Sequence, residues 1–369
     1  MKAIGIILAG GTYHGLGTLV KKRNTAAIPI GSCYRAVDFS LSNMSNSGIR
    51  KVAVMAQHNT RSLADHLSSS KWWDLGRKKG GLFLFTPDMS SSVSFGFRGT
   101  VDAMYQNISF LKRSNEPYVI ITGGEQVNRM DYRELIKYHK DKNADITIVS
   151  KKMAGQDVSK YGVLEIDENN RMINFEEKPF EPQQDVVSLG TYIVSRELLI
   201  SLLEETHKEG RYNFVTDILI RHRRKLRIYA YMFDGYWRNA RSIEEYYEMS
   251  MEFLEEDVRQ LFFKTEPYIF TKVKDEAPAK LNLGSKVTKS LLGGGVINNG
   301  TIDNSVLFRK VYVGDQAIIR NSIVMENTTI GRNCIIEYAV IDRNVVVSDN
   351  QIIVGTKDKL AIVSKDTIQ

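Results

Sequence analysis

A 17-residue repeat in the last part of the chain constrains the fold more than any other feature of the sequence. Each repeat carries three aliphatic side chains, about six positions apart. A fixed internal period indicates coils that stack and bury their aliphatic residues against one another. The three registers are Val296, Val313, Ile330 and Val347; Ile302, Ile319, Ile336 and Ile353; and Leu307, Val324 and Ile341.

This pattern predicts a left-handed parallel β-helix over residues 281–369, in which one aliphatic residue fills each side of a triangular coil. Polar positions keep the same period, since Asn304-Ser305 recurs as Asn321-Ser322 and Gly314 recurs as Gly331. A sandwich of short strands is the alternative, and three registers in phase over four coils disfavour it.

The first part of the chain, residues 1–255, has a different pattern. Short β-branched runs at 4–8, 52–55, 118–122 and 146–149 alternate with amphipathic stretches. Strands separated by helices imply crossover connections and a mostly parallel sheet, so we predict an α/β domain here. Asp131 with Glu134 and Ser242 with Glu245 have the spacing of helix-capping boxes. Residues 256–280, which include Pro267 and Pro278, form the expected linker.

Composition excludes several classes of protein. The 369 residues carry 50 Lys and Arg against 43 Asp and Glu, a mild formal charge of +7 that suits phosphate-bearing small molecules. We find no nucleic-acid-binding motif and no apolar run near the roughly 18 residues of a membrane span. The two cysteines, Cys33 and Cys334, fit neither a disulfide framework nor a zinc site. We expect a soluble, cytoplasmic protein without membrane or nucleic-acid partners.

A glycine-rich segment follows the first predicted strand. It reads Leu8-Ala9-Gly10-Gly11 and continues to Gly15-Leu16-Gly17. Glycines at this position let backbone N–H groups approach a phosphate closely. The spacing matches neither the dinucleotide-binding nor the P-loop motif, and a plain tight turn remains an alternative.

This segment and a series of later motifs resemble the sugar-1-phosphate nucleotidyltransferases, and more narrowly glucose-1-phosphate adenylyltransferase (ADP-glucose pyrophosphorylase). The resemblance covers nearly the whole chain. The later motifs include Tyr34-Arg35 with Asp38-Phe39, Gln57, Trp73-Asp74-Leu75, Gly99-Thr100, Tyr105-Gln106-Asn107, Met130-Asp131-Tyr132, Phe175 to Pro179 and Gly235-Tyr236-Trp237.

The resemblance implies a Rossmann-like nucleotidyltransferase domain followed by the β-helix. The family joins ATP and glucose 1-phosphate into ADP-glucose and pyrophosphate, with Mg²⁺, for glycogen biosynthesis. Such a reaction needs cations around the triphosphate and carboxylates on Mg²⁺. The resemblance assigns nucleotide binding to Leu8, Ala9, Gly10, Gly11, Gln57, Gly99 and Thr100, and sugar-phosphate binding to Glu177, Lys178, Gly190 and Tyr192.

Four positions depart from the family pattern, and all four carry chemistry. Gly15 stands where the family has an arginine over the triphosphate, and Thr25 stands where it has a lysine. The two metal-binding aspartates are replaced by Glu125, which at most still reaches a metal, and by the neutral Asn239. One lost charge-stabilising contact costs about 2.7–4 kcal/mol in the transition state. Several such losses, although not additive, leave very little turnover.

This combination is similar to the regulatory, GlgD-type subunit of the family. We therefore predict a chain with little or no catalysis that requires no cofactor alone. The resemblance implies that it joins a catalytic subunit, as a heterotetramer that uses Mg²⁺, and raises its activity. Its pocket can still hold ATP or glucose 1-phosphate. Lys21, Lys22 and Arg23 lie where family members hold sugar-phosphate effectors, and a solvated surface is the alternative for them.

Two enzyme functions are alternatives to the regulatory role. A self-sufficient sugar-1-phosphate nucleotidyltransferase would need His14 or Arg238 to replace the missing cations. An acyltransferase built on the β-helix would need a histidine on or near the coils, whereas all six histidines lie at or before His222. A scaffold that binds no ligand is a variant of the regulatory prediction.

Overall fold

The structure is a computed structural model that describes residues 2–11, 13–76, 80–87 and 96–365. Its contacts divide the chain into two compact units. The first unit comprises residues 1–11 and 40–237, and the second comprises residues 12–39 and 238–369. The second unit therefore combines a segment from near the N-terminus with the whole C-terminal part. None of the described helices is long and apolar enough to cross a membrane.

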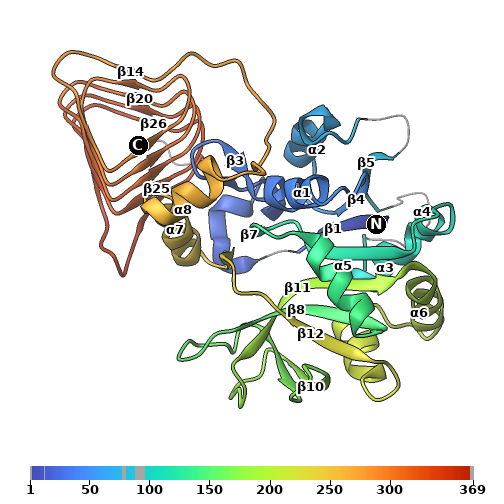
Figure 1. Ribbon diagram of the computed structural model, residues 1–369. Coiled ribbons are helices and arrows are strands. Elements are labelled where there is room, and N and C mark those ends of the chain that lie inside the picture. The colour runs from blue at the N-terminus through green and yellow to red at the C-terminus, as the bar shows by residue number, and fades with distance from the viewer. Residues whose placement is uncertain (1, 12, 77–79, 88–95, 366–369) are drawn as a thin grey trace. The chain divides into compact units, whose positions relative to one another are not determined.

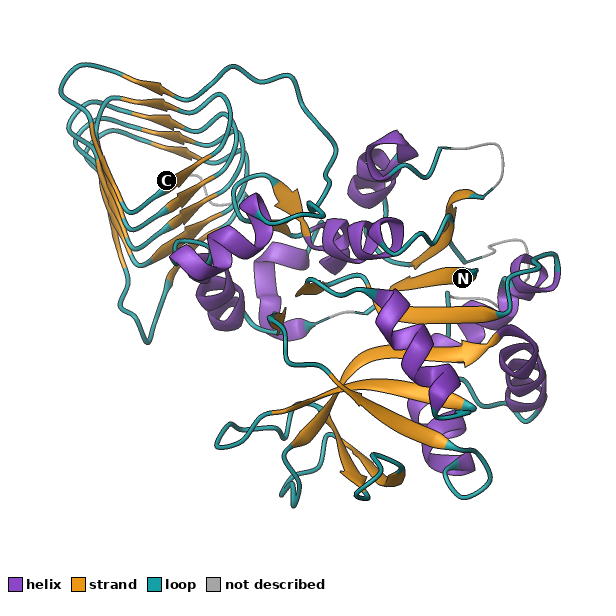
Figure 2. Cartoon of the chain, viewed as in Figure 1, coloured by secondary structure: helices purple, strands orange, loops and turns teal. Residues whose placement is uncertain are grey.

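The first unit is built on a nine-stranded sheet (Figures 1 and 2). Its main path runs β10-β9-β11-β6-β1-β4-β5, with β8 paired to β11 and β12 paired to β8. The strands are β1 (Ala3–Ala9), β4 (Lys51–Ala56), β5 (Gly81–Phe85), β6 (Tyr118–Gly123), β8 (Ile146–Lys152), β9 (Gly162–Ile166), β10 (Met172–Glu177), β11 (Val186–Ser195) and β12 (Ile228–Met232).

The sheet is parallel where strands and helices alternate and antiparallel elsewhere. β6, β1, β4 and β5 are mutually parallel, as the alternation predicts, whereas β11 runs antiparallel to β6, β8 and β9. Tight connections among β9, β10 and β11 allow antiparallel pairing, because only parallel neighbours need a crossover helix. The sheet is thus mixed rather than parallel throughout, within the expected nucleotidyltransferase architecture.

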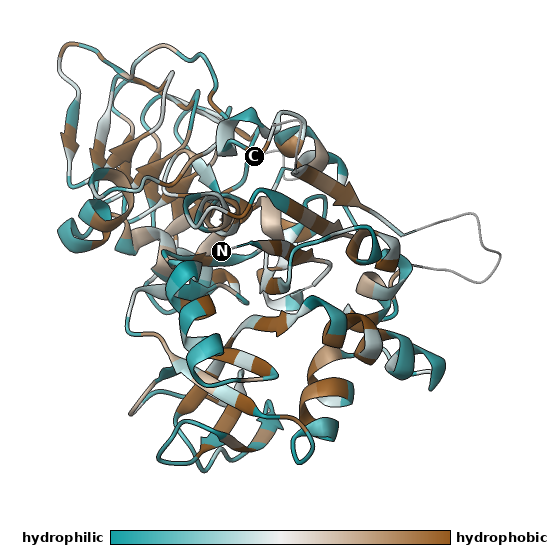
Figure 3. Cartoon of the chain, turned by 45° about the vertical axis from the view of Figure 1, so that its right-hand side comes forward, coloured by the Kyte–Doolittle hydropathy of each residue, from teal (hydrophilic) through white to brown (hydrophobic). Residues whose placement is uncertain are grey.

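The helices of the first unit are short. They are α2 (Arg61–Leu67), η3 (Ser70–Trp73), α3 (Thr100–Gln106), α4 (Ile108–Lys112), α5 (Tyr132–Asp141), α6 (Arg196–Lys208) and η4 (Val215–Ile220). α1 (Ala36–Asn46) begins in the second unit and ends in the first. Asp131 caps α5 by accepting a hydrogen bond from the Arg133 N–H at 2.9 Å, which confirms the predicted start of this helix. Hydrophobic residues gather on the strands, where Ile4, Ile121 and Val194 are fully buried (Figure 3).

The second unit contains the predicted β-helix, whose coils stack in three parallel sheets of five strands each (Figure 1). The first sheet contains β14 (Lys280–Leu281), β17 (Ile297–Asn298), β20 (Tyr312–Val313), β23 (Thr329–Ile330) and β26 (Val346–Val347). The second contains β15 (Lys286–Thr288), β18 (Thr301–Asp303), β21 (Ile318–Arg320), β24 (Ile335–Glu337) and β27 (Ile352–Val354). The third contains β16 (Leu291–Leu292), β19 (Val306–Leu307), β22 (Ile323–Val324), β25 (Ala339–Ile341) and β28 (Ala361–Val363).

Strand register confirms the 17-residue repeat between Thr301 and Val354 but corrects one predicted pair, because Val313 pairs with Asn298 and not with Val296, across a coil that is two residues shorter. Ile302 pairs with Ile319, which pairs with Ile336, and the side chains of this column are completely buried. Asparagine side chains repeat at one corner, where Asn304 Nδ2 donates to Asn321 Oδ1 at 2.7 Å. Both asparagines have positive φ, a conformation that asparagine tolerates better than most residues do.

The rest of the second unit comprises short segments and two helices. They are η1 (His14–Val20), η2 (Thr25–Ala27), β2 (Pro29–Ile30), β3 (Tyr34–Arg35), α7 (Ile243–Glu252), α8 (Glu256–Arg259) and η5 (Gln260–Lys264). Two further short strands are β7 (Gln126–Asn128) in the first unit and β13 (Trp237–Asn239) at the junction of the units. Ser242 caps α7 as predicted, since its Oγ accepts from the Glu245 N–H at 3.2 Å.

Candidate active site

The carboxyl ends of three parallel strands bring the glycine segment and the degenerate metal position together in the first unit. β1 lies between β4 and β6, and the Leu8 carbonyl accepts a hydrogen bond from the Gly124 N–H at 2.9 Å. Ligands of open α/β sheets bind at this edge. Leu8, Gly10, Gln57 and Glu125 therefore lie along one edge of the sheet.

Gly10 and Gln57 contact each other directly. Gln57 Nε2 donates to the Gly10 carbonyl at 3.5 Å, and Gln57 Oε1 accepts from the Phe97 N–H at 2.8 Å. A Cβ atom on Gly10 would lie 3.3 Å from Gln57 Cγ, so a side chain there would displace the glutamine. The structure thus places the predicted nucleotide residues of β1 and β4 next to each other.

Gly99 and Thr100 lie at the start of α3 and pack against the segment 212–214. A Cβ atom on Gly99 would lie 2.3 Å from the Tyr212 carbonyl oxygen, which explains the glycine. Thr100 Oγ1 accepts a hydrogen bond from the Phe214 N–H at 2.9 Å. These contacts hold the start of α3 in place, so Gly99 and Thr100 have a structural role in addition to the predicted nucleotide binding.

Glu177 is the last residue of β10, and Lys178, the second residue predicted to bind the sugar phosphate, follows it. Lys178 has a positive φ of 50°, and its N–H donates to the Tyr161 carbonyl at 3.1 Å. Its Nζ lies 3.7 Å from Glu177 Oε1, and 59% of the lysine side chain is exposed. The ammonium group is therefore held near a carboxylate and remains accessible to an anionic ligand.

Gly190 and Tyr192 lie on β11, where the register with β8 shifts between Ser188 and Thr191. Gly190 has a positive φ of 67°, and a Cβ atom there would lie 3.2 Å from Gln126 Nε2. Burial, assisted by the charge of Glu177, raises the pKa of Tyr192 to about 12. The Tyr192 hydroxyl therefore stays neutral over the whole physiological range.

Gln126 is a site residue that the sequence patterns did not single out. Its Oε1 lies 3.4 Å from each of two donors, Thr191 Oγ1 and Trp237 Nε1. Thr191 Oγ1 is in turn 2.8 Å from Thr122 Oγ1. This buried polar network lies next to Gly190. The only signal in the sequence was its position directly after Glu125.

The side chain of Glu125 folds back toward its own turn. A Cβ atom on Gly123 would lie only 2.9 Å from Glu125 Oε1. Among the described residues there is no group of three or more His, Cys, Asp or Glu side chains that could hold a metal ion. The second metal position of the family, Asn239, lies in the other unit and is a buried neutral amide. No hydrogen-bond partner for its Oδ1 occurs in the part of the chain described.

This donor set does not fit Mg²⁺, which is usually bound through carboxylates and retained waters. In the first unit Glu125 supplies one carboxylate, whereas Asn239 of the second unit is a neutral amide without charge for a metal ion.

Gly15 lies in η1 and is exposed, but a side chain at this position would begin against the backbone of residues 241–242. A Cβ atom on Gly15 would lie 2.6 Å from the Arg241 carbonyl oxygen and 3.2 Å from Ser242 Cα. Real Cβ atoms essentially never approach a backbone oxygen this closely, so any larger residue requires the loop to move. Leu16 and Leu19 anchor the loop, because both are buried. The glycine is thus part of how this loop packs against the start of α7.

Thr25 occupies the position of the missing lysine and starts η2. It is 2% exposed, and its carbonyl accepts from the Ile28 N–H at 3.1 Å. The preceding Asn24 caps the turn through a 2.9 Å hydrogen bond from the Ala26 N–H. A lysine at this position would place a long side chain with a charged ammonium group in a buried turn, whereas the shorter, uncharged threonine side chain fits there.

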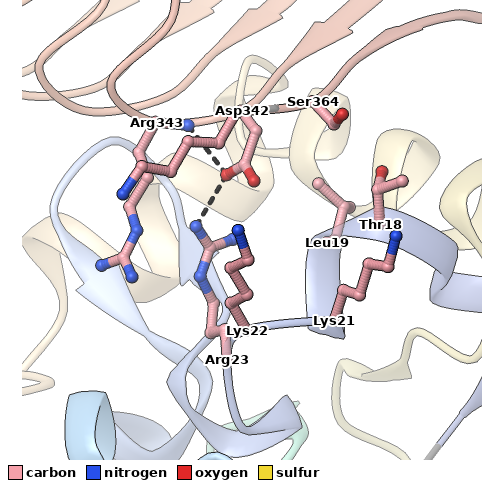
Figure 4. A pocket seen from close by; sticks show the side chains of 9 residues that line it. Thr18, Leu19, Lys21, Lys22, Arg23, Asp342, Arg343 and Ser364 are labelled. Carbon is pink, nitrogen blue, oxygen red and sulfur yellow. Dashed lines mark hydrogen bonds and ion pairs between the residues drawn. The ribbon is translucent and has the colours of Figure 1, made fainter. Parts of the chain in front are cut away.

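A basic pocket lies between the end of η1 and the β-helix, both in the second unit (Figure 4). Its volume is about 140 Å³, and its lining includes Lys21, Lys22, Arg343 and the buried Thr18 hydroxyl. The predicted effector residues therefore lie together. Arg23 differs from the two lysines, because it is 4% exposed and its Nη2 lies 2.7 Å from Asp342 Oδ1. Arg23 is therefore paired with a carboxylate of the pocket lining.

Comparison with known proteins agrees with this geometry. The Nucleotidyl transferase family model matches residues 4–256, and the GlmU-like C-terminal hexapeptide model matches residues 277–361. The chain therefore belongs to the nucleotidyl transferase family, with a hexapeptide-repeat domain after the catalytic fold.

More narrowly, it belongs to the family of the glucose-1-phosphate adenylyltransferases. It is 34% identical to the enzyme of that name from Mycoplasma mobile over 86% of this chain and 84% of the relative. It is 36% identical to the one from Clostridium acetobutylicum, again over 86% and 84%. For the Desulfitobacterium hafniense Y51 protein the identity is 34%, over 86% of this chain and 81% of the relative.

Proposed function

We propose that this chain is a regulatory, weakly catalytic or non-catalytic subunit of ADP-glucose pyrophosphorylase. In this role it associates with a catalytic adenylyltransferase subunit and raises the rate of ADP-glucose synthesis for glycogen. The observation that carries the proposal is that a Cβ atom on Gly15 would lie 2.6 Å from the Arg241 carbonyl oxygen. The loop that should present a cation to the triphosphate is instead closed against backbone of its own unit.

The other departures support the same conclusion. Phosphoryl transfer from ATP depends on positioned cations and on metal-bridged phosphate oxygens, because the attacking and leaving groups are both anionic. Thr25 is buried and uncharged, and Asn239 is a buried amide. Each lost contact of this kind costs on the order of 10²–10³ in rate. In the assembly, the catalytic subunit would supply both the triphosphate cations and the Mg²⁺ ligands.

The residues predicted to bind the sugar phosphate support ligand binding without catalysis. Lys178 is accessible, Tyr192 is neutral, and the Gln126 network is intact. A pocket that binds glucose 1-phosphate or ATP without turnover can report ligand occupancy to a neighbouring subunit. The basic pocket of Lys21 and Lys22 is suited to a compact sugar-phosphate effector in the same regulatory scheme.

A self-sufficient nucleotidyltransferase is the alternative, and the surroundings of Arg238 weigh against it. Its Nε lies 3.0 Å from both carboxylate oxygens of Glu252, and its Nη2 lies 2.6 Å from Glu252 Oε1. A guanidinium bound in this bidentate way is already neutralised. For Arg238 to replace a lost cation, this pair would have to break.

The test is a comparison of ADP-glucose synthesis by this chain, by a catalytic subunit and by their mixture. A rate for the mixture above the sum of the separate rates supports the regulatory role. A rate for the isolated chain near that of the catalytic subunit contradicts it.

A further inference from the structure

A groove lies between α7 and the side of the β-helix, within the second unit (Figure 1). Its volume is about 510 Å³, within the roughly 300–1,000 Å³ of small-molecule pockets. α7 contributes Tyr247 and Glu248 to its lining, and the coils contribute Asn304, Asn321 and Tyr338. None of its lining residues belongs to the basic pocket. We call this separate candidate site the α7 groove.

Tyr338 is an unusual residue for its place in the β-helix. It belongs to the corner column of Asn304 and Asn321, and the three residues have positive φ values of 43°, 46° and 45° in chain order. Asparagine tolerates this conformation, whereas a bulky residue in it is an outlier. Every other described position of the β-helix with positive φ carries Asn, Gln, Lys or Gly. Backbone strain of this kind gathers at functional sites, so we looked for a use of the tyrosine ring.

The two tyrosines of the groove differ in how far they are covered. Tyr247 is 8% exposed, and its hydroxyl donates to the Asn321 carbonyl at 2.7 Å. Burial, with a smaller effect of the nearby Tyr338, raises the pKa of Tyr247 to about 12. Tyr338 is only half-buried. Tyr247 therefore forms a fixed, neutral wall of the groove, while part of the Tyr338 ring remains accessible.

Polar groups adjoin this aromatic surface. Asn304 Nδ2 donates to Asn321 Oδ1 at 2.7 Å. The next residue of the column is Tyr338, so Asn321 Nδ2 has no further amide in this column to donate to. Glu248 and Lys357, both exposed, add a hydrogen-bond acceptor and a donor to the lining. An aromatic face beside amide and carboxylate groups matches a sugar ring, which has apolar C–H faces and hydroxyl groups at its edge.

The charges of the groove favour a ligand without phosphate. Glu248 and Glu255 are exposed carboxylates, and Lys357 is the single lysine in the lining. The third carboxylate, Glu252, is paired with Arg238, whose Nη2 lies 2.6 Å from its Oε1. A phosphate would face an excess of like charge here, whereas a neutral polyhydroxylated ligand would not. The α7 groove thus differs from the basic pocket in the chemistry that it suits.

We propose that the α7 groove binds a neutral oligosaccharide, with the Tyr338 ring packed on the face of one sugar unit and with Asn321 and Glu248 bonded to hydroxyl groups. The proposal does not depend on the regulatory role, because it concerns the isolated chain and residues outside the candidate active site.

The experiment measures binding of maltotriose and of cellotriose to the full-length chain, by calorimetry and by saturation-transfer NMR at millimolar sugar. Tyr338→Asn is the main variant. It restores the asparagine of the column and relieves the positive φ, so the thermal midpoint should stay unchanged or rise. Tyr338→Phe keeps the ring and is the conservative variant. Tyr312→Asn is the matched control, since Tyr312 is 39% exposed on β20 of the same β-helix.

We expect the parent chain to bind at least one of the two trisaccharides. Loss of the ring in Tyr338→Asn should raise the dissociation constant roughly five- to tenfold, whereas Tyr338→Phe and Tyr312→Asn should change it less than about twofold. Saturating glucose 1-phosphate should leave the sugar affinity unchanged, because its predicted site lies in the first unit.

Three results would overturn the proposal. The first is that neither trisaccharide binds, including the case in which the groove takes up the cation spermidine instead. The second is that Tyr338→Asn binds as well as the parent chain, or that Tyr338→Phe loses as much affinity as Tyr338→Asn. The third is displacement of the trisaccharide by glucose 1-phosphate, which would place the sugar in the candidate active site.

Discussion

The carbonyl oxygen of Arg241 lies 2.6 Å from the point where a side chain on Gly15 would begin. The family's triphosphate arginine is therefore absent for a steric reason as well as a chemical one. The glycine and the packing of the loop against the start of α7 depend on each other, because a larger side chain would prevent this packing. This relationship predicts that an arginine cannot be accommodated at position 15 unless the loop moves.

Gly15→Arg should lower stability without creating activity. Overpacking against backbone costs about 1–3 kcal/mol, so the free energy of unfolding in urea should fall by that amount, and ADP-glucose synthesis should stay at the level of the parent chain. The neighbouring His14→Arg adds the same charge at an exposed position and should leave stability within about 0.5 kcal/mol. A Gly15→Arg chain that is both stable and active would show that the loop accommodates the arginine.

Lys22→Ala should weaken anion binding in the basic pocket. A hydrogen bond to a charged group contributes about 1.5–3 kcal/mol, so affinity for a sugar phosphate should fall by roughly 10- to 100-fold. Calorimetry on the isolated chain and activation curves of the assembled complex both report this. Lys137→Ala, an exposed lysine on α5, is the control. Activation curves identical for Lys22→Ala and the parent would count against an effector role.

The Arg23–Asp342 ion pair should contribute strongly to the stability of the second unit. Both side chains are buried, at 4% and 10% exposure, and removing one partner leaves an uncompensated charge. Arg23→Met should therefore cost about 3–5 kcal/mol. The double variant Arg23→Met with Asp342→Asn should cost less than the sum of the two single variants. Strictly additive losses in urea unfolding would mean that the two residues act independently.

His139 should make the first unit sensitive to acid. It is 3% exposed, and burial lowers its pKa from 6.5 to about 4. The folded state therefore favours the neutral ring. The resulting stability is complete above about pH 6.5 and is lost as pH falls toward 4, by about 3 kcal/mol in total at 1.36 kcal/mol per pKa unit.

Urea unfolding at pH 7.5, 5.5 and 4.5 checks this contribution. The variant His139→Gln should lose less stability over that range than the parent chain, because it lacks the titrating ring. Carboxylates titrate in both proteins and cancel in the comparison. Equal losses in the two proteins would show that protonation of His139 is not coupled to unfolding.

The sequence predicted the β-helix well, because its repeat is a direct record of inward side chains. It also located the caps of α5 and α7, Asp131 and Ser242, whose side chains accept from backbone N–H groups two and three positions further on. It could not show that residues 12–39 pack with the C-terminal part of the chain. That packing depends on pairs such as Arg23 and Asp342, which are separated by 319 positions.

The sequence predicted which residues belong to the site, but it did not predict which other residues they contact. Comparison with the family pattern located Gly15, Thr25, Glu125 and Asn239. The pattern could not show that Gly15 packs against the Arg241 carbonyl, since nothing local in the sequence records that contact. Gln126 was missed for a similar reason, because its partners Thr191 and Trp237 are brought to it only by the sheet.

The most direct test of the regulatory role is the initial rate of ADP-glucose formation by the purified chain, measured alone and with a catalytic subunit at saturating ATP, glucose 1-phosphate and Mg²⁺. We predict that the chain alone is at least 100-fold slower than the catalytic subunit, as loss of one charge-stabilising contact already requires. We also predict that the mixture exceeds the sum of its parts. A chain that makes ADP-glucose alone at a rate comparable to the catalytic subunit would contradict the account.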